Sequence, residues 1–417
     1  MTWLALAGAL FLAWLVLVFL FTPGIRYHVR TRVSLDAPEF LHTLESTCQA
    51  AVHGGNRIEV LTNGRAFYPA MLDAIRGAER SVNMECYIFQ PGRTAAQFMD
   101  ALCDRASHGV VVTVVLDALG SAAMAGAELA RLRDAGVRVE FYQRIRWYSL
   151  ARLNNRTHRE LLVVDGRIAF TGGAGVADWW SGEDPAQPAW RDTMVRVEGP
   201  VVGALQGVMA ENWLECCGEI LTGDEFFPRL EPAGDILAFV VKSSPADRAT
   251  VSRVTFQMLI EAARREVLIN TPYFLPDRSL RACFVAAAKR GVAVRIVVPG
   301  ARTDQRWVRL ASRRGYKALL GAGIRIFEYQ PSMMHAKMLI VDDDWAVVGT
   351  TNVDNRSFEH NDEVNLALCD RDLAARLQAD HQRDVADSRE VTLEAWQQRP
   401  VWEKLLGPIV WILERQQ

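Results

Sequence analysis

The sequence predicts an α/β fold built from two duplicated halves, each an α-β-α sandwich with a mixed, largely parallel sheet, preceded by an N-terminal transmembrane helix. Three observations predict it: an apolar N-terminal segment, an order of strand and helix patterns that occurs twice, and a histidine motif that follows each copy. The chain has 417 residues. That length exceeds the usual size of one domain, so two domains or two fused copies of one are expected.

The N-terminal segment predicts a membrane anchor, because residues 3–21 contain no charged side chain. About 20 apolar residues are what a helix needs to cross the hydrocarbon core of a bilayer. No basic residue precedes the segment, and Phe21-Thr22-Pro23 makes a poor cleavage site, so we expect residues 1–24 to be a retained anchor and not a signal peptide. The positive-inside rule places the body of the protein in the cytoplasm, because basic residues follow the segment at Arg26, Arg30 and Arg32.

Two stretches repeat the order helix, strand, helix, strand, helix, strand. They cover residues 71–142 and 258–327. The strands are runs of apolar, mostly β-branched residues, and helices end at glycines, namely Gly109, Gly136, Gly291 and Gly323. Strands that alternate with helices predict parallel pairing within an α/β sheet.

The two copies divide the rest of the chain. We expect a linker over 25–56, a first half over 57–222, a second linker over 223–234 and a second half over 235–395. Residues 396–417 form an amphipathic tail, whose apolar residues are interrupted at Gly407-Pro408. The tail can lie in the membrane interface, where tryptophan is favoured, or pack on the second half as a helix.

Composition narrows the class of ligand. The chain has 47 basic and 49 acidic side chains and a formal net charge of -2, so no overall basic surface favours a nucleic acid, and an anionic substrate must be bound locally. The seven cysteines lack metal-ligand spacing, and we expect mostly buried, reduced thiols. Neither a metal nor another cofactor is expected, because no cluster of Asp, Glu and His residues resembles a metal motif.

A second repeated pattern follows each stretch. In the second half it comprises a histidine, a lysine, the strand MLIV, an aspartate and, after six more residues, a turn: His335, Lys337, Asp342 and Gly349-Thr350-Thr351-Asn352. In the first half it comprises a histidine, a glutamate, the strand LLVV, an aspartate and, after six more residues, a glycine turn: His158, Glu160, Asp165 and Gly172-Gly173. Two copies in register on a duplicated background indicate a shared function.

These residue types predict a phosphate site. Residues two apart on a strand share a face, so His335 and Lys337 project together, and the next strand brings Asn352 back to the same end. An imidazole, an ammonium and an amide suit a phosphate oxyanion. Two half-sites related by an approximate twofold would place two histidines across one phosphodiester. One can attack phosphorus and form a phosphohistidine, while the other protonates the leaving alkoxide and later deprotonates the incoming alcohol or water.

Each histidine also needs an acidic partner, which fixes its tautomer and stabilises its cation. We expect Glu363, in the segment HNDEVNLAL, to serve His335. Asp192, in WRDTMVRV, holds the corresponding place for His158.

Two further sets of residues each have two interpretations. Asp165 and Asp342 stand at strand ends, where they can be catalytic or can form turns through side-chain to backbone bonds. Trp179, Trp180 and Trp190 follow the first motif and can pack in the core or form a lip that enters the bilayer.

The pattern His-x-Lys-x4-Asp-x6-Gly-x2-Asn resembles the signature of the phospholipase D superfamily, complete in the second half and partial in the first. The segments NTPYFLPD, TTNVDNRSFEHNDEVNL and THRELLVVDGRIAFTGG are similar to those of bacterial cardiolipin synthases, and the likeness covers roughly residues 57–370. It implies a phosphatidyltransferase of the bacterial inner membrane that acts on membrane phospholipids and makes cardiolipin from two phosphatidylglycerol molecules, releasing glycerol. It also implies that His158 is the nucleophile and His335 the general acid and base, although the two roles can be exchanged.

The first half departs from the signature, with Glu160 in place of lysine and Gly175 in place of asparagine. A carboxylate beside a bound phosphate would be repelled, even at an effective dielectric constant of about 20. Three alternatives remain open. Glu160 turns aside to an ion pair with Arg156 or Arg159, or it contacts the acceptor headgroup, or the first half is degraded and the protein binds lipid without turnover. A hydrolase that releases phosphatidic acid is a further alternative, since water can replace the acceptor alcohol.

Overall fold

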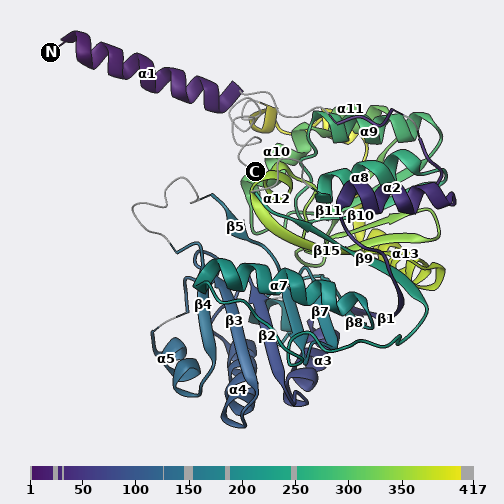
Figure 1. The fold of residues 1–417 in the computed structure, drawn as a ribbon. Coiled ribbons are helices and arrows are strands. Elements are labelled where there is room, and N and C mark those ends of the chain that lie inside the picture. The colour runs from purple at the N-terminus through teal and green to yellow at the C-terminus, as the bar shows by residue number, and fades with distance from the viewer. Residues whose placement is uncertain are drawn as a thin grey trace.

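The computed structural model describes residues 2–21, 27–30, 32–124, 126–144, 154–183, 188–245 and 251–404. These residues form two α/β halves that share one sheet, and a separate helix lies at the N-terminus (Figure 1). The predicted α/β class is confirmed.

The first half alternates strands and helices and then turns to short antiparallel strands. β3 shows why: its sequence VVTVVLD is apolar and β-branched, and all but its first residue are buried, as expected of a central parallel strand. The elements are β1 (His53–Thr62), α3 (Gly64–Arg76), β2 (Ser81–Cys86), α4 (Arg93–Ser107), β3 (Val111–Asp117), α5 (Gly126–Asp134), β4 (Arg138–Tyr142), β5 (Arg156–Thr157), β6 (Leu161–Val164), β7 (Ile168–Gly172), α6 (Asp178–Ser181), β8 (Thr193–Glu198) and α7 (Val201–Cys217).

The second half repeats this order with additions at its end. Its helices α9, α12 and α13 each begin with an aspartate at the N-cap, whose carboxylate accepts a backbone hydrogen bond. The elements are β9 (Ile236–Ser243), α8 (Val251–Ala262), β10 (Glu266–Asn270), α9 (Arg278–Lys289), β11 (Ala293–Pro299), α10 (Arg306–Arg314), α11 (Tyr316–Gly321), β12 (Arg325–Tyr329), β13 (Met338–Val341), β14 (Trp345–Gly349), α12 (Asn355–Glu359), β15 (Asn361–Cys369), α13 (Arg371–Ala386), β16 (Ser388–Val391) and α14 (Leu393–Gln397).

The strands of both halves form one mixed sheet, in the order β16-β12-β11-β10-β13-β14-β15-β9-β1-β8-β7-β6-β2-β3-β4. Along this path, only β2-β3-β4 and β10-β11-β12 are parallel. The expected separate and largely parallel sheets are therefore wrong. Parallel neighbours need a crossover connection, which the repeated helices supply, whereas the later strands of each half follow one another through shorter connections and pair antiparallel.

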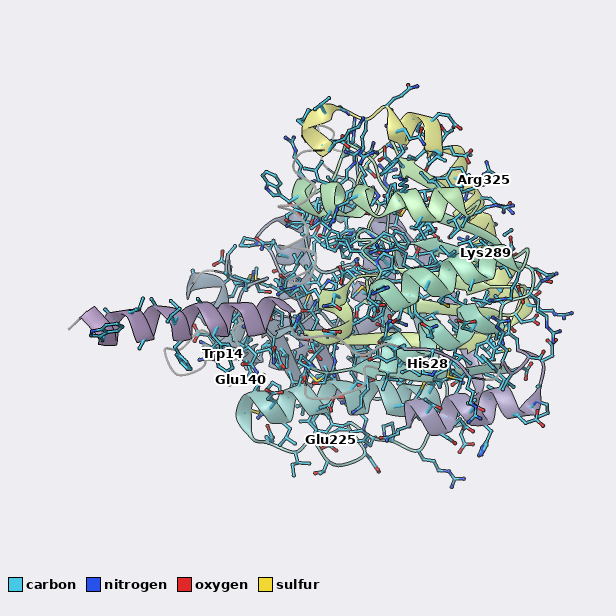
Figure 2. All side chains as sticks on the ribbon, turned by 90° about the horizontal axis from the view of Figure 1, so that it is seen from above. Trp14, His28, Glu140, Glu225, Lys289 and Arg325 are labelled. Carbon is cyan, nitrogen blue, oxygen red and sulfur yellow. The ribbon has the colours of Figure 1, made fainter. Side chains whose placement is uncertain are left out.

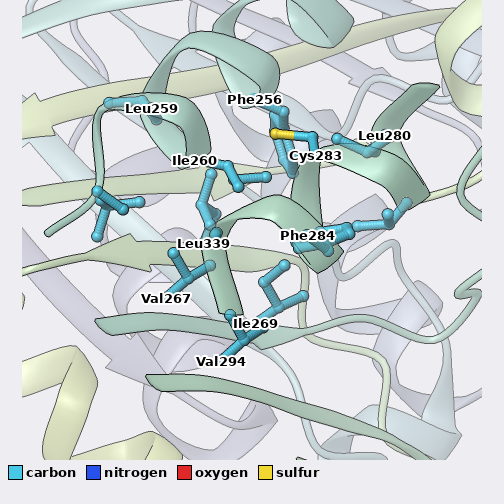
Figure 3. Packing of buried hydrophobic residues seen from close by; sticks show 14 of the residues in the cluster. Phe256, Leu259, Ile260, Val267, Ile269, Leu280, Cys283, Phe284, Val294 and Leu339 are labelled. Carbon is cyan, nitrogen blue, oxygen red and sulfur yellow. The ribbon is translucent and has the colours of Figure 1, made fainter. Parts of the chain in front are cut away.

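Helices cover both faces of the sheet and bury three large apolar cores. One core packs α3 and α4 on the first half, and another packs α8 and α9 on the second, where Phe256, Ile260 and Phe284 meet the strands (Figure 3). The third core lies under α7 and α13 and contains strand residues of both halves. Val114 and Val115 face different cores, because successive strand residues point to opposite faces. The third core thus holds the two halves together.

α1 (Thr2–Phe21) projects from the body of the molecule, as the ribbon and side-chain views both show (Figures 1 and 2). Its Trp3 and Trp14 are 81% and 56% exposed. Among the side chains that the structure describes, no helix combines the length and the apolar character that crossing a membrane requires.

α2 (Pro38–Cys48) lies within the segment 25–56, which the sequence analysis treats as a linker. Its Phe40 and Leu44 are buried in the core of the second half, so this part of the segment is packed structure. In the tail, Val401 and Trp402 are 67% and 53% exposed. Residues 405–417 lie outside the described residues, so the position of the tail stays a prediction.

Candidate active site

The two histidines lie at equivalent places in the two halves. His158 stands between β5 and β6, and His335 stands just before β13. β6 lies beside β2, and β13 lies in the same way beside β10. Read outward from the β1–β9 pair, the two sides of the sheet have matching strand orders. The predicted approximate twofold therefore relates the two motifs.

The segment before each histidine crosses to the other half. The backbone amide of His158 donates to the carbonyl oxygen of Asp362 at 2.9 Å, directly after β5 pairs with β15. In the other direction, the amides of His335 and Ala336 donate to the carbonyl oxygen of Arg191 at 2.7 and 3.0 Å. The crossing places each histidine beside the acidic residue of the opposite half.

Each imidazole contacts a carboxylate of that opposite half. Nδ1 of His158 lies 3.1 and 3.0 Å from the two carboxylate oxygens of Glu363. Nδ1 of His335 lies 2.7 Å from Oδ2 of Asp192. The expected pairing of Glu363 with His335 and of Asp192 with His158 is therefore wrong. The correction follows from the crossing, because β5 of the first half lies against β15, which carries Glu363.

A buried cluster of charges surrounds His335. Nζ of Lys337 lies 2.9 and 3.1 Å from the two ring nitrogens of His335 and donates to its carbonyl oxygen at 2.8 Å. Burial lowers the pKa of Lys337 to about 8, although Asp192 and Glu363 act in the opposite direction. Burial and the ammonium of Lys337 lower the pKa of His335. Glu363, the partner of His158, thus acts on the lysine of the other motif, and the two half-sites share one electrostatic environment.

Asp192 is fully buried but stays ionised. Burial raises its pKa, but His335 and Lys337 outweigh that effect, and the pKa lies below its usual range. The same carboxylate accepts a hydrogen bond from Nε1 of Trp180 at 2.9 Å. Asp192 therefore holds His335 with a charge and is itself held in place.

The turn after each motif contributes different groups in the two halves. In the second half, the Thr350 hydroxyl donates to Glu363. Asn352 is 3% exposed, and within the described residues its side-chain oxygen has no hydrogen-bond partner. A buried polar atom without a partner is uncommon in proteins. The Asn352 amide, whose O and N are assigned from their surroundings, is therefore available to a ligand.

Glu160 points away from every cation named for it in the sequence analysis. Its Oε1 accepts from the backbone amides of Tyr87 and Ile88 at 3.1 and 3.4 Å, and its Oε2 accepts from the Cys86 thiol at 3.0 Å. Burial raises the pKa of Glu160 to about 8, against the effect of these hydrogen bonds.

Of the three alternatives for Glu160, the ion pair with Arg156 or Arg159 is wrong. Arg159 pairs with Glu211 at 3.0 Å, and Arg156 lies 3.6 Å from Asp117. Adjacent residues of extended chain point to opposite faces, so Arg159 reaches α7 on one face of the sheet while Glu160 reaches the end of β2 on the other.

Asp165 and Asp342 lie at the far ends of β6 and β13, with left-handed φ angles of 54° and 53°. Each carboxylate accepts from three successive backbone amides before the neighbouring strand, those of Glu79, Arg80 and Ser81 or of Arg264, Arg265 and Glu266. Each aspartate follows a strand of four residues, β6 or β13, and each strand residue spans about 3.3 Å. The histidine of the same motif stands before the opposite end of that strand. The hydrogen bonds to backbone amides support the turn-forming interpretation of both aspartates, and a direct catalytic role stays a prediction.

Aromatic rings flank both histidines, although the sequence did not predict them as site residues. The ring centroids of Trp180 and Trp190 lie 5.3 Å from that of His335, and the ring of Tyr87 lies 5.3 Å from that of His158. Trp180 is fully buried, so core packing is confirmed for it. The tryptophans come just before Asp192 in the sequence, which is the one signal that could have placed them at the site.

Buried polar networks support the crossing segments from behind. Arg191 donates to Asp384 of α13 at 2.8 Å. Behind His158, Glu85 accepts hydrogen bonds from Thr157 and Asn212, and burial raises the pKa of Glu85 to about 7. These networks hold the crossing backbone in place, because a buried polar group that lost its partner would be costly.

Within the described ranges, no three His, Cys, Asp or Glu side chains gather as ligands of a metal would. All seven cysteines are free, and Cys48, Cys86 and Cys283 are buried.

Comparisons with known proteins show the family to which the chain belongs. The family model described as "Cardiolipin synthase, PLD-like domain" matches residues 71–181 and 257–385, which include His158 and His335. The chain is 36% identical over 340 residues to a protein named cardiolipin synthase A from Pseudomonas putida, covering 81% of this chain and 70% of that protein. A protein of the same name from Pseudomonas syringae is 34% identical over 343 residues, with the same coverage.

Solved structures share the fold. A phosphatidylserine synthase from Haemophilus influenzae matches with a TM-score of 0.69 over 91% of this chain and 100% of that one, at 12% identity. A polyphosphate kinase from Porphyromonas gingivalis matches with a TM-score of 0.52 over 92% of this chain and 61% of that one, at 11% identity. At such identities the likeness concerns the fold alone. On the family model and the relatives together, the chain belongs to the phospholipase D-like cardiolipin synthase family.

Proposed function

We propose that this protein is a phospholipase D-type phosphatidyltransferase that makes cardiolipin from two phosphatidylglycerol molecules and releases glycerol. The observation that carries the proposal is the pair of histidines, each with Nδ1 on a carboxylate of the opposite half. With Nδ1 held, Nε2 of His158 is left to react. The names of the Pseudomonas relatives support cardiolipin as the product.

In the first step, Nε2 of His158 attacks the phosphorus of the donor lipid. An N–P bond forms, and the bond between phosphorus and the oxygen of the glycerol headgroup breaks. Glu363 stabilises the positive charge that develops on the His158 ring. His335, protonated at Nε2, gives its proton to the leaving alkoxide, which departs as glycerol.

In the second step, His335 takes the proton from a hydroxyl of the acceptor phosphatidylglycerol. The hydroxyl oxygen attacks phosphorus, the N–P bond breaks, and His158 is restored. The lowered pKa of His335 favours the neutral ring that a base requires. Water in place of the acceptor would give phosphatidic acid by the same route.

Lys337 and Asn352 are the proposed phosphate-binding residues. Lys337 is buried beside His335, and its ammonium can turn from the His335 carbonyl to a phosphate oxygen. The buried amide of Asn352, whose oxygen has no partner within the described residues, can present its N–H to the same group. Both interactions grow in strength as charge develops on the phosphate oxygens.

We also propose that residues 1–24 anchor the protein in the bacterial inner membrane as a single pass, with the two halves in the cytoplasm. The uncharged segment 3–21 and the arginines after it support this arrangement. Deleting residues 2–24 should move the protein from the carbonate-washed membrane fraction to the supernatant. Retention of the shortened protein on the washed membrane would contradict the anchor.

The enzymatic proposal is tested with purified protein and vesicles of phosphatidylglycerol labelled in the glycerol headgroup. The expected result is equal amounts of free glycerol and diphosphatidyl product in the wild type, and loss of steady-state turnover in His335→Ala, which can release at most one glycerol per enzyme as the His158 adduct forms. Phosphatidic acid as the sole lipid product would indicate the hydrolase instead. Absence of turnover with any phosphodiester lipid would favour a lipid-binding protein without activity.

A further inference from the structure

We propose that Glu160 is a positioning residue. It fixes the turn 86–88 and, through Tyr87, the position of the His158 ring. At this position the first half therefore supplies support for its histidine and no phosphate-binding cation. The inference rests on the proposed function, because it assigns roles within the phosphatidyl-transfer site. It concerns the residue that stands where the family signature has lysine.

Within the described residues, the side-chain hydrogen bonds of Glu160 are all with one tripeptide. Its two oxygens accept from the thiol of Cys86 and from the amides of Tyr87 and Ile88. The residue is 5% exposed, and both of its carboxylate oxygens already accept hydrogen bonds from this tripeptide. We therefore assign the carboxyl group to the turn directly after β2 and not to the acceptor headgroup.

The tripeptide carries the ring that flanks His158. Glu160 holds the amide of Tyr87, and the hydroxyl of Ser121 donates to the Tyr87 carbonyl oxygen at 2.9 Å. Held on both sides, Tyr87 sets its ring edge-on to His158, with an interplanar angle of 72°. The chain of contacts thus runs from Glu160 through the backbone of Tyr87 to the imidazole.

The second half shows why its own motif has lysine at this position. The β-bridge Phe89–Val176 of the first half corresponds to the β-bridge Phe274–Val353 of the second. Tyr87 stands two positions before Phe89, and Pro272 stands two positions before Phe274, so Pro272 is the counterpart of Tyr87. Proline has no N–H, so a carboxylate at position 337 would lack the counterpart of the Tyr87 amide. Lys337 lies instead on the ring of His335. Each residue suits the backbone of its own half.

The second departure from the signature follows from the first. A Cβ at Gly175 would lie 2.5 Å from the carbonyl oxygen of Ile88 and 3.0 Å from Oε1 of Glu160. An asparagine cannot fit there while Glu160 holds the turn. Glu160 and Gly175 thus suit each other, and the first half has no side chain at the position where the second half has Asn352.

The charge of Glu160 is compatible with a phosphate nearby. Burial raises its pKa to about 8, so the carboxyl group is largely neutral near pH 7 and does not repel an anionic lipid. A neutral acid that accepts from two amides is mimicked by glutamine. Neither alanine nor lysine can accept those hydrogen bonds.

The test compares Glu160→Gln, Glu160→Ala and Glu160→Lys in the full-length enzyme on phosphatidylglycerol vesicles. E160Q should keep most of the wild-type kcat. E160A and E160K should lose about 100-fold in kcat, the scale of a small misplacement of a reacting group, while KM for the donor stays near the wild-type value because Lys337 is intact. A gain of activity in E160K, or a rise in KM without loss of kcat in E160A, would overturn the inference.

Further variants exclude a general loss of folding. Tyr87→Ala should reproduce the kcat loss of E160A, and the double variant should lose little more, since both act through the same contact. Glu328→Gln alters a buried carboxylate of β12 that lies outside the site, and should leave kcat unchanged. Additive losses in the double variant would contradict the inference. A wild-type enzyme without any turnover would instead remove the proposed function itself.

Discussion

Replacement of Glu363 by glutamine tests the crossed pairing of histidines and carboxylates. The Glu363 oxygens lie 3.1 and 3.0 Å from Nδ1 of His158. Glutamine keeps the shape of the side chain and one acceptor oxygen but removes the negative charge, and its amide nitrogen cannot accept a hydrogen bond from Thr350 or Asn361. The imidazolium-like ring that forms as His158 attacks phosphorus then loses its counter-charge.

The magnitude follows from the contact. A hydrogen bond to a charged group contributes about 1.5–3 kcal/mol, and each 1.36 kcal/mol of barrier changes a rate about tenfold. E363Q should therefore slow the first chemical step about 10- to 150-fold. KM for the donor should change little, because Lys337 and Asn352 are untouched.

The assay is rapid-quench measurement of glycerol release in a single turnover, which reports the first step alone. Asp192→Asn serves as the matched variant, because Asp192 contacts His335 and not His158. D192N should impair both the protonation of the leaving group and the later deprotonation of the acceptor, and so should also slow the second step. If E363Q left glycerol release at the wild-type rate and slowed only the second step, the crossed pairing would not govern the chemistry.

Three further changes have defined outcomes. Lys337→Gln should raise KM for phosphatidylglycerol at neutral pH. In the wild type, KM should rise as the pH passes about 8, where the ammonium of Lys337 loses its proton. A wild-type KM that stays flat from pH 6 to 9 would contradict this role of Lys337. Asp342→Ala removes the acceptor of three backbone amides. It should lower the free energy of unfolding in denaturant by about 2 kcal/mol and leave kcat of the folded enzyme intact. A loss of kcat with unchanged stability would indicate a catalytic role for Asp342. Trp180→Phe, which removes the hydrogen bond to Asp192, should lower kcat by roughly tenfold or less, and an unchanged kcat would show that Asp192 needs no such support.

Much of the fold could be predicted because its signals are local. The βαβ units follow from apolar β-branched strands and glycine-terminated helices, and β2-β3-β4 and β10-β11-β12 are parallel as expected. The rest of the sheet could not be predicted in the same way. Whether β9 pairs with β1 or closes a separate sheet depends on contacts between distant segments, which no periodicity records.

The site shows the same division. The spacing of His335 and Lys337 lies within one half, and the structure brings these two side chains together. Asn352, at the end of the same motif, is buried. The partners of the histidines come from the opposite half, and spacing along the chain cannot reveal such a crossing. The residue types Asp192 and Glu363 were predicted, and only their assignment was wrong.

Glu160 shows the limit of a motif as evidence. Its side chain has ordinary candidate partners in Arg156 and Arg159, yet it binds backbone amides. Backbone donors are invisible in a sequence, because every residue except proline has one. Only the place of the turn after β2 makes those amides available to Glu160.

The central claim is that both histidines serve one phosphodiester and that His158 carries the phosphatidyl group. Its most direct test is to quench His335→Asn with phosphatidylglycerol labelled in the phosphate and to map the label by peptide analysis. The account predicts an acid-labile phosphatidyl adduct on His158, and none in His158→Asn. An adduct on His335 in the His158→Asn enzyme, or no adduct in either variant of an enzyme whose wild type turns over, would contradict it.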